Sequence, residues 1–169
     1  MKRKALAWIL VLLLSISIVG CAETSSKAEG EPQNQDEAAV NRVVEDFGRK
    51  LQLVSLLAPE DVLEKSMQEH YGGFVSPGLL EQWLKDPVNA PGRFTSSPWP
   101  DRIEILSTEK ISEEAYEVKG EIIEVADVEK KEIVAKRPII LVVEKTDGKW
   151  MICDAAIEEM NEREGIIQS

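Results

Sequence analysis

The sequence predicts an α+β fold, because helical and strand patterns occupy separate parts of the chain. Apolar residues recur at helical spacing over residues 37–85, and apolar and polar residues alternate after residue 102. A run dense in Pro, Gly and Ser separates the two regions, and Asp147-Gly148 marks a tight hairpin. Segregated helices and strands joined by short turns are typical of helices packed against an antiparallel sheet. We therefore expect three N-terminal helices against a four-stranded antiparallel sheet.

Composition places the chain among globular proteins and excludes several functional classes. The 169 residues carry 31 acidic and 20 basic side chains, and the net charge is -11. A hydrophobic content of 43 % argues against a wholly disordered chain. The acidity argues against nucleic-acid binding, which needs a basic face. Two Cys and one His are too few for a zinc finger or a disulfide scaffold, so no metal and no cofactor are expected.

The N-terminal segment 1–20 has the pattern of an export signal. Three positive charges at residues 2–4 precede the uncharged, aliphatic run 5–20, which is short for a membrane-spanning helix. It ends in Ile18-Val19-Gly20-Cys21, which resembles the lipobox of bacterial lipoproteins. The resemblance implies cleavage between Gly20 and Cys21 and diacylglycerol on the Cys21 sulfur. The alternative is an uncleaved N-terminal anchor with a chance Cys.

Acylation of Cys21 would place the protein on the extracytoplasmic face of the cell membrane. Loss of residues 1–20 would remove three positive charges and bring the net charge from -11 to -14. An anionic lipid surface would repel such a domain, so the lipid is the expected membrane contact. Cys153 would then be the one remaining thiol. We expect it to be buried and inert on a strand, and a reactive thiol is the alternative.

The next segment, 21–36, is interpreted as a flexible tether, because residues 22–36 contain no aliphatic side chain larger than Ala. From Glu37 to the residue before Pro59, helical spacing predicts one long amphipathic helix. A second helix is expected from Pro59 to Gly72-Gly73, and a third from the capping pair Ser76-Pro77 to Asp86. The inward-facing residues of these two helices are predicted to be Val62, Leu63, Met67, Leu79, Leu80, Trp83 and Leu84.

A sixteen-residue loop, 86–101, is predicted before the sheet, and loops of this length are often functional. Four strands follow, with a bulge expected near Gly120–Ile123 where the alternation changes phase. The apolar run 139–143 predicts a central strand buried on both faces. Arg137-Pro138 is expected to break that strand and to mark an edge position or a bulge. The domain is assigned to residues 37–157 and an acidic tail to 158–169.

The element order and one hairpin resemble the NTF2-like (cystatin-like) superfamily over residues 37–157. The hairpin runs Val142-Val143-Glu144-Lys145-Thr146-Asp147-Gly148-Lys149-Trp150-Met151-Ile152-Cys153-Asp154. The resemblance implies a curved sheet wrapped round the first helix, with a cone-shaped cavity between them. Some members are isomerases or dehydratases, and many others are non-catalytic binding or assembly modules. Fold alone therefore does not decide function.

Five residues are candidates for a cavity or loop site. His70 ends the second helix, where capping of the helix C-terminus competes with catalysis. Trp99, with Arg102 in the same Pro-rich loop, is a candidate lid or partner contact, or a plug for the open end of the sheet. Arg137 is a candidate anion ligand in the cavity, or a partner for a surface Glu. Tyr116 is expected in the core, together with Trp83 and Trp150.

We therefore expect a membrane-anchored binding or assembly module for an unidentified protein or small-molecule ligand. The alternative is a cavity isomerase or hydratase, which would need His70 or a carboxylate facing an open apolar pocket. A pocket filled by Trp, Leu and Ile would argue against that enzyme. A third possibility is partner binding through an apolar patch on the outer face of the sheet.

Overall fold

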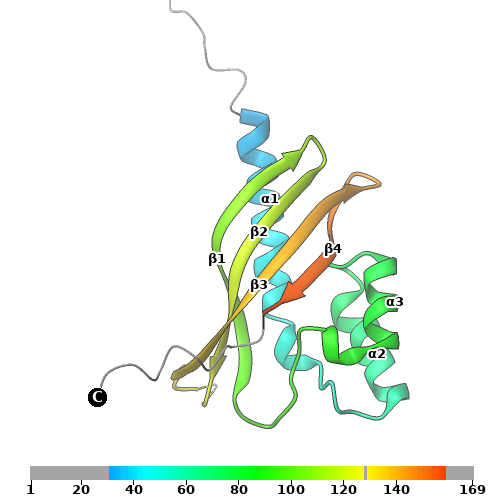
Figure 1. The fold of residues 1–169 in the computed structure, drawn as a ribbon, viewed down its shortest axis with the longest axis vertical. Helices are drawn as coiled ribbons and strands as arrows, with labels where there is room; N and C mark the ends of the chain where they lie inside the picture. The colour runs from blue at the N-terminus through cyan, green and yellow to red at the C-terminus, as the bar shows by residue number, and fades with distance from the viewer. Residues whose placement is uncertain (1–30, 128, 159–169) are drawn as a thin grey trace, which may run out of the picture.

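The computed structural model describes residues 31–127 and 129–158, and confirms the predicted architecture of three helices against a four-stranded antiparallel sheet (Figure 1). The strands pair in the order β1-β2-β3-β4. The signal segment and the lipobox lie outside the described residues. The elements are α1 (Glu31–Gly48), η1 (Leu51–Leu53), α2 (Glu60–Tyr71), α3 (Pro77–Lys85), η2 (Pro87–Asn89), β1 (Trp99–Ser112), β2 (Ala115–Val125), β3 (Ile133–Thr146) and β4 (Lys149–Ile157).

Helix α1 lies along one face of the sheet, and α2 and α3 pack beside its C-terminal half (Figure 1). We call the sheet face that α1 covers the inner face. Val40, Val44 and Phe47 of α1 are fully buried there, as their helical spacing predicts. They pack with inward-facing residues of the strands, which include Tyr116, Val118, Ile122, Ile139, Leu141, Val143 and Ile152.

The limits of α1 differ from the prediction at both ends. The helix begins at Glu31, inside the segment 21–36 that was assigned to the tether, and Asp36 forms an ion pair of 3.3 Å with Lys145 of β3. It ends at Gly48 rather than before Pro59. A Cβ at Gly48 would lie 2.6 Å from the backbone nitrogen of Ile103 on β1, so only glycine permits this contact. The chain continues through the short helix η1, where Leu51 is buried.

The second and third helices begin and end close to the predicted residues. Helix α2 stops before Gly72, and the side chain of Ser76 caps α3 by accepting a hydrogen bond from the Leu79 amide at 3.3 Å. Leu63 and Met67 face the core as predicted. The prediction for Val62 was wrong, because this side chain is 50 % exposed on the outer side of α2.

Strand β1 begins at Trp99, so the loop before it is shorter than the predicted 86–101. The expected bulge at Gly120–Ile123 is absent from the described β2, whose pairing with β1 and β3 is continuous there. The register shifts between β1 and β2 lie instead on β1, at Asp101, Leu106 and Ile111. Ile122 and Ile123 are both buried because the two faces of β2 are both covered at this point, which explains the change of phase in the sequence.

Strand β3 is central, as predicted, but it is not broken at Arg137-Pro138. The prediction that this strand is buried on both faces was also wrong. Ile139, Leu141 and Val143 are buried, but Ile140 and Val142 are only half-buried. Pro138 directly precedes the part of β3 that pairs with β4. Its carbonyl accepts a hydrogen bond of 3.0 Å from the Glu158 amide. The proline therefore occupies a local edge, which is the position predicted for it.

The Asp147-Gly148 turn between β3 and β4 is confirmed, and both residues have positive φ, 51° and 76°. These angles match the turn type that Asp-Gly pairs favour. The outer edge of β4 is covered by the chain that joins α2 and α3. Ile152 donates its amide to the Phe74 carbonyl and accepts from the Ser76 amide, each at 2.8 Å. This pairing removes part of an exposed strand edge.

Candidate functional site

The candidate site lies at the end of the sheet where β4 ends, next to residues 86–98 (Figure 1). Charged side chains line two hollows there. We call this site the mouth, and it consists of two hollows that share Phe94 and Arg137 in their walls. The larger hollow has a volume of about 550 Å³ and the smaller about 240 Å³. The side chains that line the two hollows include Val88, Arg93, Phe94, Glu124, Arg137 and Ile157.

Arg137 reaches the mouth because of the register of the sheet. It pairs with Ile122 of β2, whose side chain is in the core, so both side chains stand on the inner face. Its Nε donates a hydrogen bond of 2.7 Å to Glu124 Oε1, and the two side chains are only 18 % and 14 % exposed. Within residues 31–127 and 129–158, its two terminal nitrogens donate no hydrogen bond.

Arg93 provides a second guanidinium at the smaller hollow. Its guanidinium carbon lies 4.6 Å from the centre of the Trp99 ring, a distance at which cation–π attraction holds the two planes together. The Arg93 Nε is buried and has no hydrogen-bond acceptor among the described residues. The backbone of Arg93 is fixed on both sides, because it donates to the Val54 carbonyl and accepts from the Leu56 amide, each at 2.9 Å.

The loop that carries Arg93 is also held from the core. The buried Tyr71 hydroxyl donates a hydrogen bond of 2.7 Å to the carbonyl of Pro91. Burial raises the pKa of Tyr71 far above its usual value, so the hydroxyl stays protonated and remains a donor. The hydrogen bonds to Pro91 and to the backbone of Arg93 therefore fix the position of Arg93 at the mouth.

Tyr71→Phe tests this support. We expect the substitution to lower the free energy of unfolding by about 1–2 kcal/mol, because it leaves the Pro91 carbonyl without its buried donor. It should also increase hydrogen exchange at the Arg93 amide, measured by NMR, more than at the Ile152 amide in β4. If the substitution changed the exchange rate of the Arg93 amide no more than that of the Ile152 amide, a role for Tyr71 in holding the loop would be contradicted.

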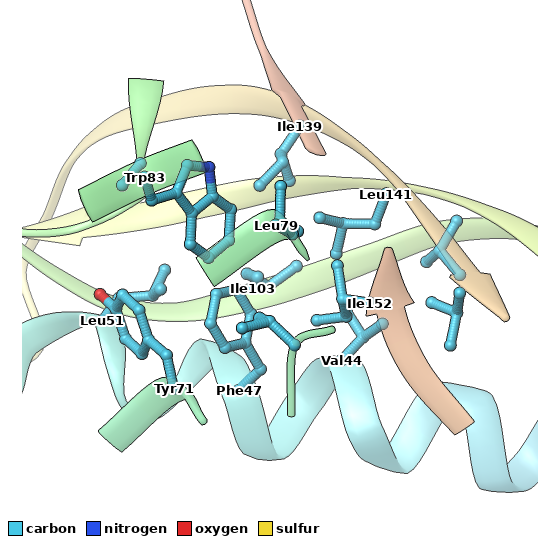
Figure 2. Packing of buried hydrophobic residues seen from close by; sticks show 14 of the residues in the cluster. Val44, Phe47, Leu51, Tyr71, Leu79, Trp83, Ile103, Ile139, Leu141 and Ile152 are labelled. Atoms are coloured by element: carbon cyan, nitrogen blue, oxygen red, sulfur yellow. The ribbon is translucent and has the colours of Figure 1, made fainter. Parts of the chain in front are cut away.

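Aromatic side chains occupy the space between α1, α2, α3 and the sheet, where the family resemblance implied a cavity (Figure 2). The Phe47 ring lies 5.0 Å from Tyr71 edge to face and 6.1 Å from Trp83 in a stacked arrangement. Tyr71 and Trp83 are 5.9 Å apart. Their exposed fractions do not exceed 2 %. The space next to these rings is therefore packed by side chains.

The structure does not bring the five candidate residues together. Trp99 lies in β1 rather than in a loop and supports Arg93. Tyr116 is a core residue as predicted, 5.4 Å from Trp150, and its register places it at the opposite end of β2 from Glu124. His70 is half-buried in the last turn of α2, consistent with the expected capping position. Of the five, Arg137 and Trp99 belong to or support the mouth.

Arg102 points to the outer face of the sheet, since its neighbour Ile103 is buried on the inner face. It forms ion pairs with Asp101, at 2.9 Å, and with Glu104. Lys131 binds the other oxygen of Asp101, and Lys136 lies between Glu104 and Glu121. These residues form a charged network over the buried Ile123. We assign the network to structure rather than to ligand binding.

The sequence analysis missed Arg93, Phe94 and Glu124 as site residues. Arg93 and Phe94 stand in the 86–101 loop, whose length was the available signal. Glu124 looked like one of many solvated acids, and no local pattern links it to Arg137 thirteen residues later. Cys153 is half-buried rather than buried, and burial raises the pKa of its thiol, which agrees with an inert group.

No family model and no curated protein matches the sequence. The solved structures that are similar to it include the following two. One is the NTF2 protein named Rd1NTF2_05, with five substitutions, which is 12 % identical with a TM-score of 0.37, over 78 % of this chain and 100 % of its own. The other is an NTF-2 like protein of unknown function from Shewanella oneidensis MR-1, 15 % identical with a TM-score of 0.31, over 77 % and 95 %. These values carry no argument about function.

Proposed function

We propose that this protein is a lipid-anchored, extracytoplasmic binding module with an NTF2-like domain, and that its ligand binds at the mouth. The observation that supports binding there is the pair of guanidinium groups held by Glu124 and Trp99 beside two hollows. The lipobox-like Ile18-Val19-Gly20-Cys21 supports the anchor. Among the described residues, no helix is long and apolar enough to cross a membrane.

The arrangement of acids and bases favours binding over catalysis. A cavity isomerase or hydratase would need a carboxylate or His70 facing an open apolar pocket. Phe47, Tyr71 and Trp83 fill the space beside the inner face, and Glu124 is engaged by Arg137. No observation favours the enzyme specifically. The proposed function is therefore non-catalytic.

Cys21→Ala tests the anchor. We expect this variant to lose acylation and to leave the membrane fraction, or to accumulate with its signal uncleaved, because the thiol is the group that would carry the lipid. Fractionation with immunoblotting and intact-mass measurement would detect either result. Cys153→Ala is the matched control and should stay membrane-bound. A Cys21→Ala variant that is processed and retained as usual would overturn the anchor.

Binding at the mouth is tested by NMR on the full chain in detergent micelles, with a set of small acids, alcohols and amines as probes. We expect chemical-shift changes at the Phe94 amide and the Arg137 side-chain ¹⁵Nε. The exposed Leu57 amide serves as the control position. Probes that move no signal at the mouth, or that move Leu57 equally, would overturn the proposed site.

A further inference from the structure

The smaller hollow of the mouth has a local charge opposite to that of the whole chain, whereas the larger hollow has both Arg137 and Glu158 in its wall. Arg93 and Arg137 line the smaller hollow together with a single carboxylate, Glu124, whereas the protein as a whole carries a net charge of -11. Both guanidinium groups are partly removed from water, so each interacts with a nearby anion more strongly than a surface lysine would. An anionic group is therefore the chemistry that this hollow complements.

The two terminal nitrogens of Arg137 remain available to bind an anion, and together they form a fork of parallel donors. Glu124 accepts only from Nε, at 2.7 Å, and the two terminal nitrogens have no acceptor among the described residues. Two parallel N–H groups match the spacing of two carboxylate oxygens. Arg93, which lines the same hollow, adds a second positive charge beside this fork.

The larger hollow offers an apolar surface next to that fork. Val88 is 71 % exposed, and Phe94 and Ile157 also face this space. Phe94 and Arg137 line both hollows, so a ligand with its anionic end at Arg137 would lay an apolar body against Phe94 and Val88. The volume of about 550 Å³ is in the range of small-molecule pockets.

We propose that the ligand of the mouth is a small monocarboxylate with an apolar body, held through its carboxylate by Arg137 and Arg93. This inference rests on the proposed function and specifies its ligand class. A single negative charge fits better than a phosphate dianion, because Glu124 is part of the site and would repel the second charge. The larger hollow also exposes the apolar side chains of Phe94 and Val88, and inorganic phosphate has no apolar part that could pack against them.

The test uses the full chain in detergent micelles, with phenylacetate as the probe, and follows the Arg137 ¹⁵Nε and Phe94 amide signals during titration. The neutral analogue 2-phenylethanol and inorganic phosphate are titrated in parallel, and a titration into empty micelles corrects for partitioning. We expect phenylacetate to bind at least tenfold more tightly than either comparison compound. Equal binding of the alcohol would overturn the carboxylate class but would leave the mouth as a binding site.

Three variants separate ligand contact from a structural role. Arg137→Gln should weaken phenylacetate binding at least tenfold, because it removes the forked donors. Glu124→Gln should tighten binding severalfold, since it removes a competing negative charge, and a merely structural pair would not give this increase. Arg49→Gln, which removes an exposed arginine of another ion pair, should leave the affinity unchanged.

Each variant is first compared with the original protein by thermal unfolding. If Arg137→Gln unfolds, Arg137→Lys is used instead, and the Glu124→Gln result still decides. Unchanged affinity in a folded Arg137 variant, or weaker binding in folded Glu124→Gln, would overturn the assignment of the carboxylate to Arg137. A site that binds none of the three probes would overturn both this inference and the ligand-binding role of the mouth.

Discussion

Replacing Trp83 by alanine is expected to lower the free energy of unfolding by about 4 kcal/mol, because large-to-small changes of buried aromatic side chains cost about 3–5 kcal/mol. Trp83 is 2 % exposed, and its indole ring contacts both Phe47 and Tyr71 (Figure 2). Truncation would remove these contacts from α1 and α2 at once. Chemical denaturation with urea, followed by circular dichroism, measures the change.

The matched control is Leu57→Ala, since this large apolar residue is 72 % exposed. Its stability should change by no more than about 0.5 kcal/mol. A loss below about 1.5 kcal/mol for Trp83→Ala would contradict the close packing of the aromatic cluster. So small a loss would mean that the Trp83 indole is loosely packed in the original protein, and the case for a filled inner face would fail.

The sequence predicted those elements whose limits are set by neighbouring residues. Ser76-Pro77 starts α3, Gly72 follows α2, and Asp147-Gly148 closes the last hairpin. The end of α1 could not be predicted, because Gly48 lies at that end against the backbone of Ile103, a residue far along the chain. The apolar spacing continues to Val54, and both Leu51 in η1 and Val54 directly after it are buried although α1 does not continue.

The candidate site was predictable only in part, for a related reason. Arg137 was noted because a proline follows it in an apolar strand, and this proline does mark a local edge, where the pairing of β3 with β4 ends. Its face depends on its register with Ile122, and its partner Glu124 belongs to another strand. Arg93 carried no signal of its own. The pairing between strands therefore determines which residues form the site, and this pairing cannot be derived from a single sequence.

Asp101→Asn is the second change with a large expected effect, about 2 kcal/mol of lost stability at pH 7. Asp101 is 7 % exposed and is the buried charged residue in the part of the chain described here. Arg102 and Lys131 each bind one of its oxygens. These partners are 35 % and 54 % exposed, so solvent screens them and the loss is smaller than for a fully buried pair.

This contribution should depend on pH in a defined direction. Burial alone would raise the pKa of Asp101, but hydrogen bonds from Lys131 and Arg102 outweigh burial and lower the pKa below its ordinary value. A carboxyl whose pKa is lower in the folded state stabilises the fold fully above its unfolded pKa of about 3.9. That stability is lost as the pH falls through the lower, folded pKa.

The difference in unfolding free energy between the original protein and Asp101→Asn should therefore be constant from pH 7 to about pH 5 and shrink below it. Urea unfolding at a series of pH values measures it, and the difference should also decrease at high salt. Asp154→Asn is the control, because this exposed residue hydrogen-bonds only the next amide, which asparagine can also do. A difference that persists unchanged at pH 2 would mean that Asp101 contributes through its shape rather than its charge, and the charged network would then be incidental to stability.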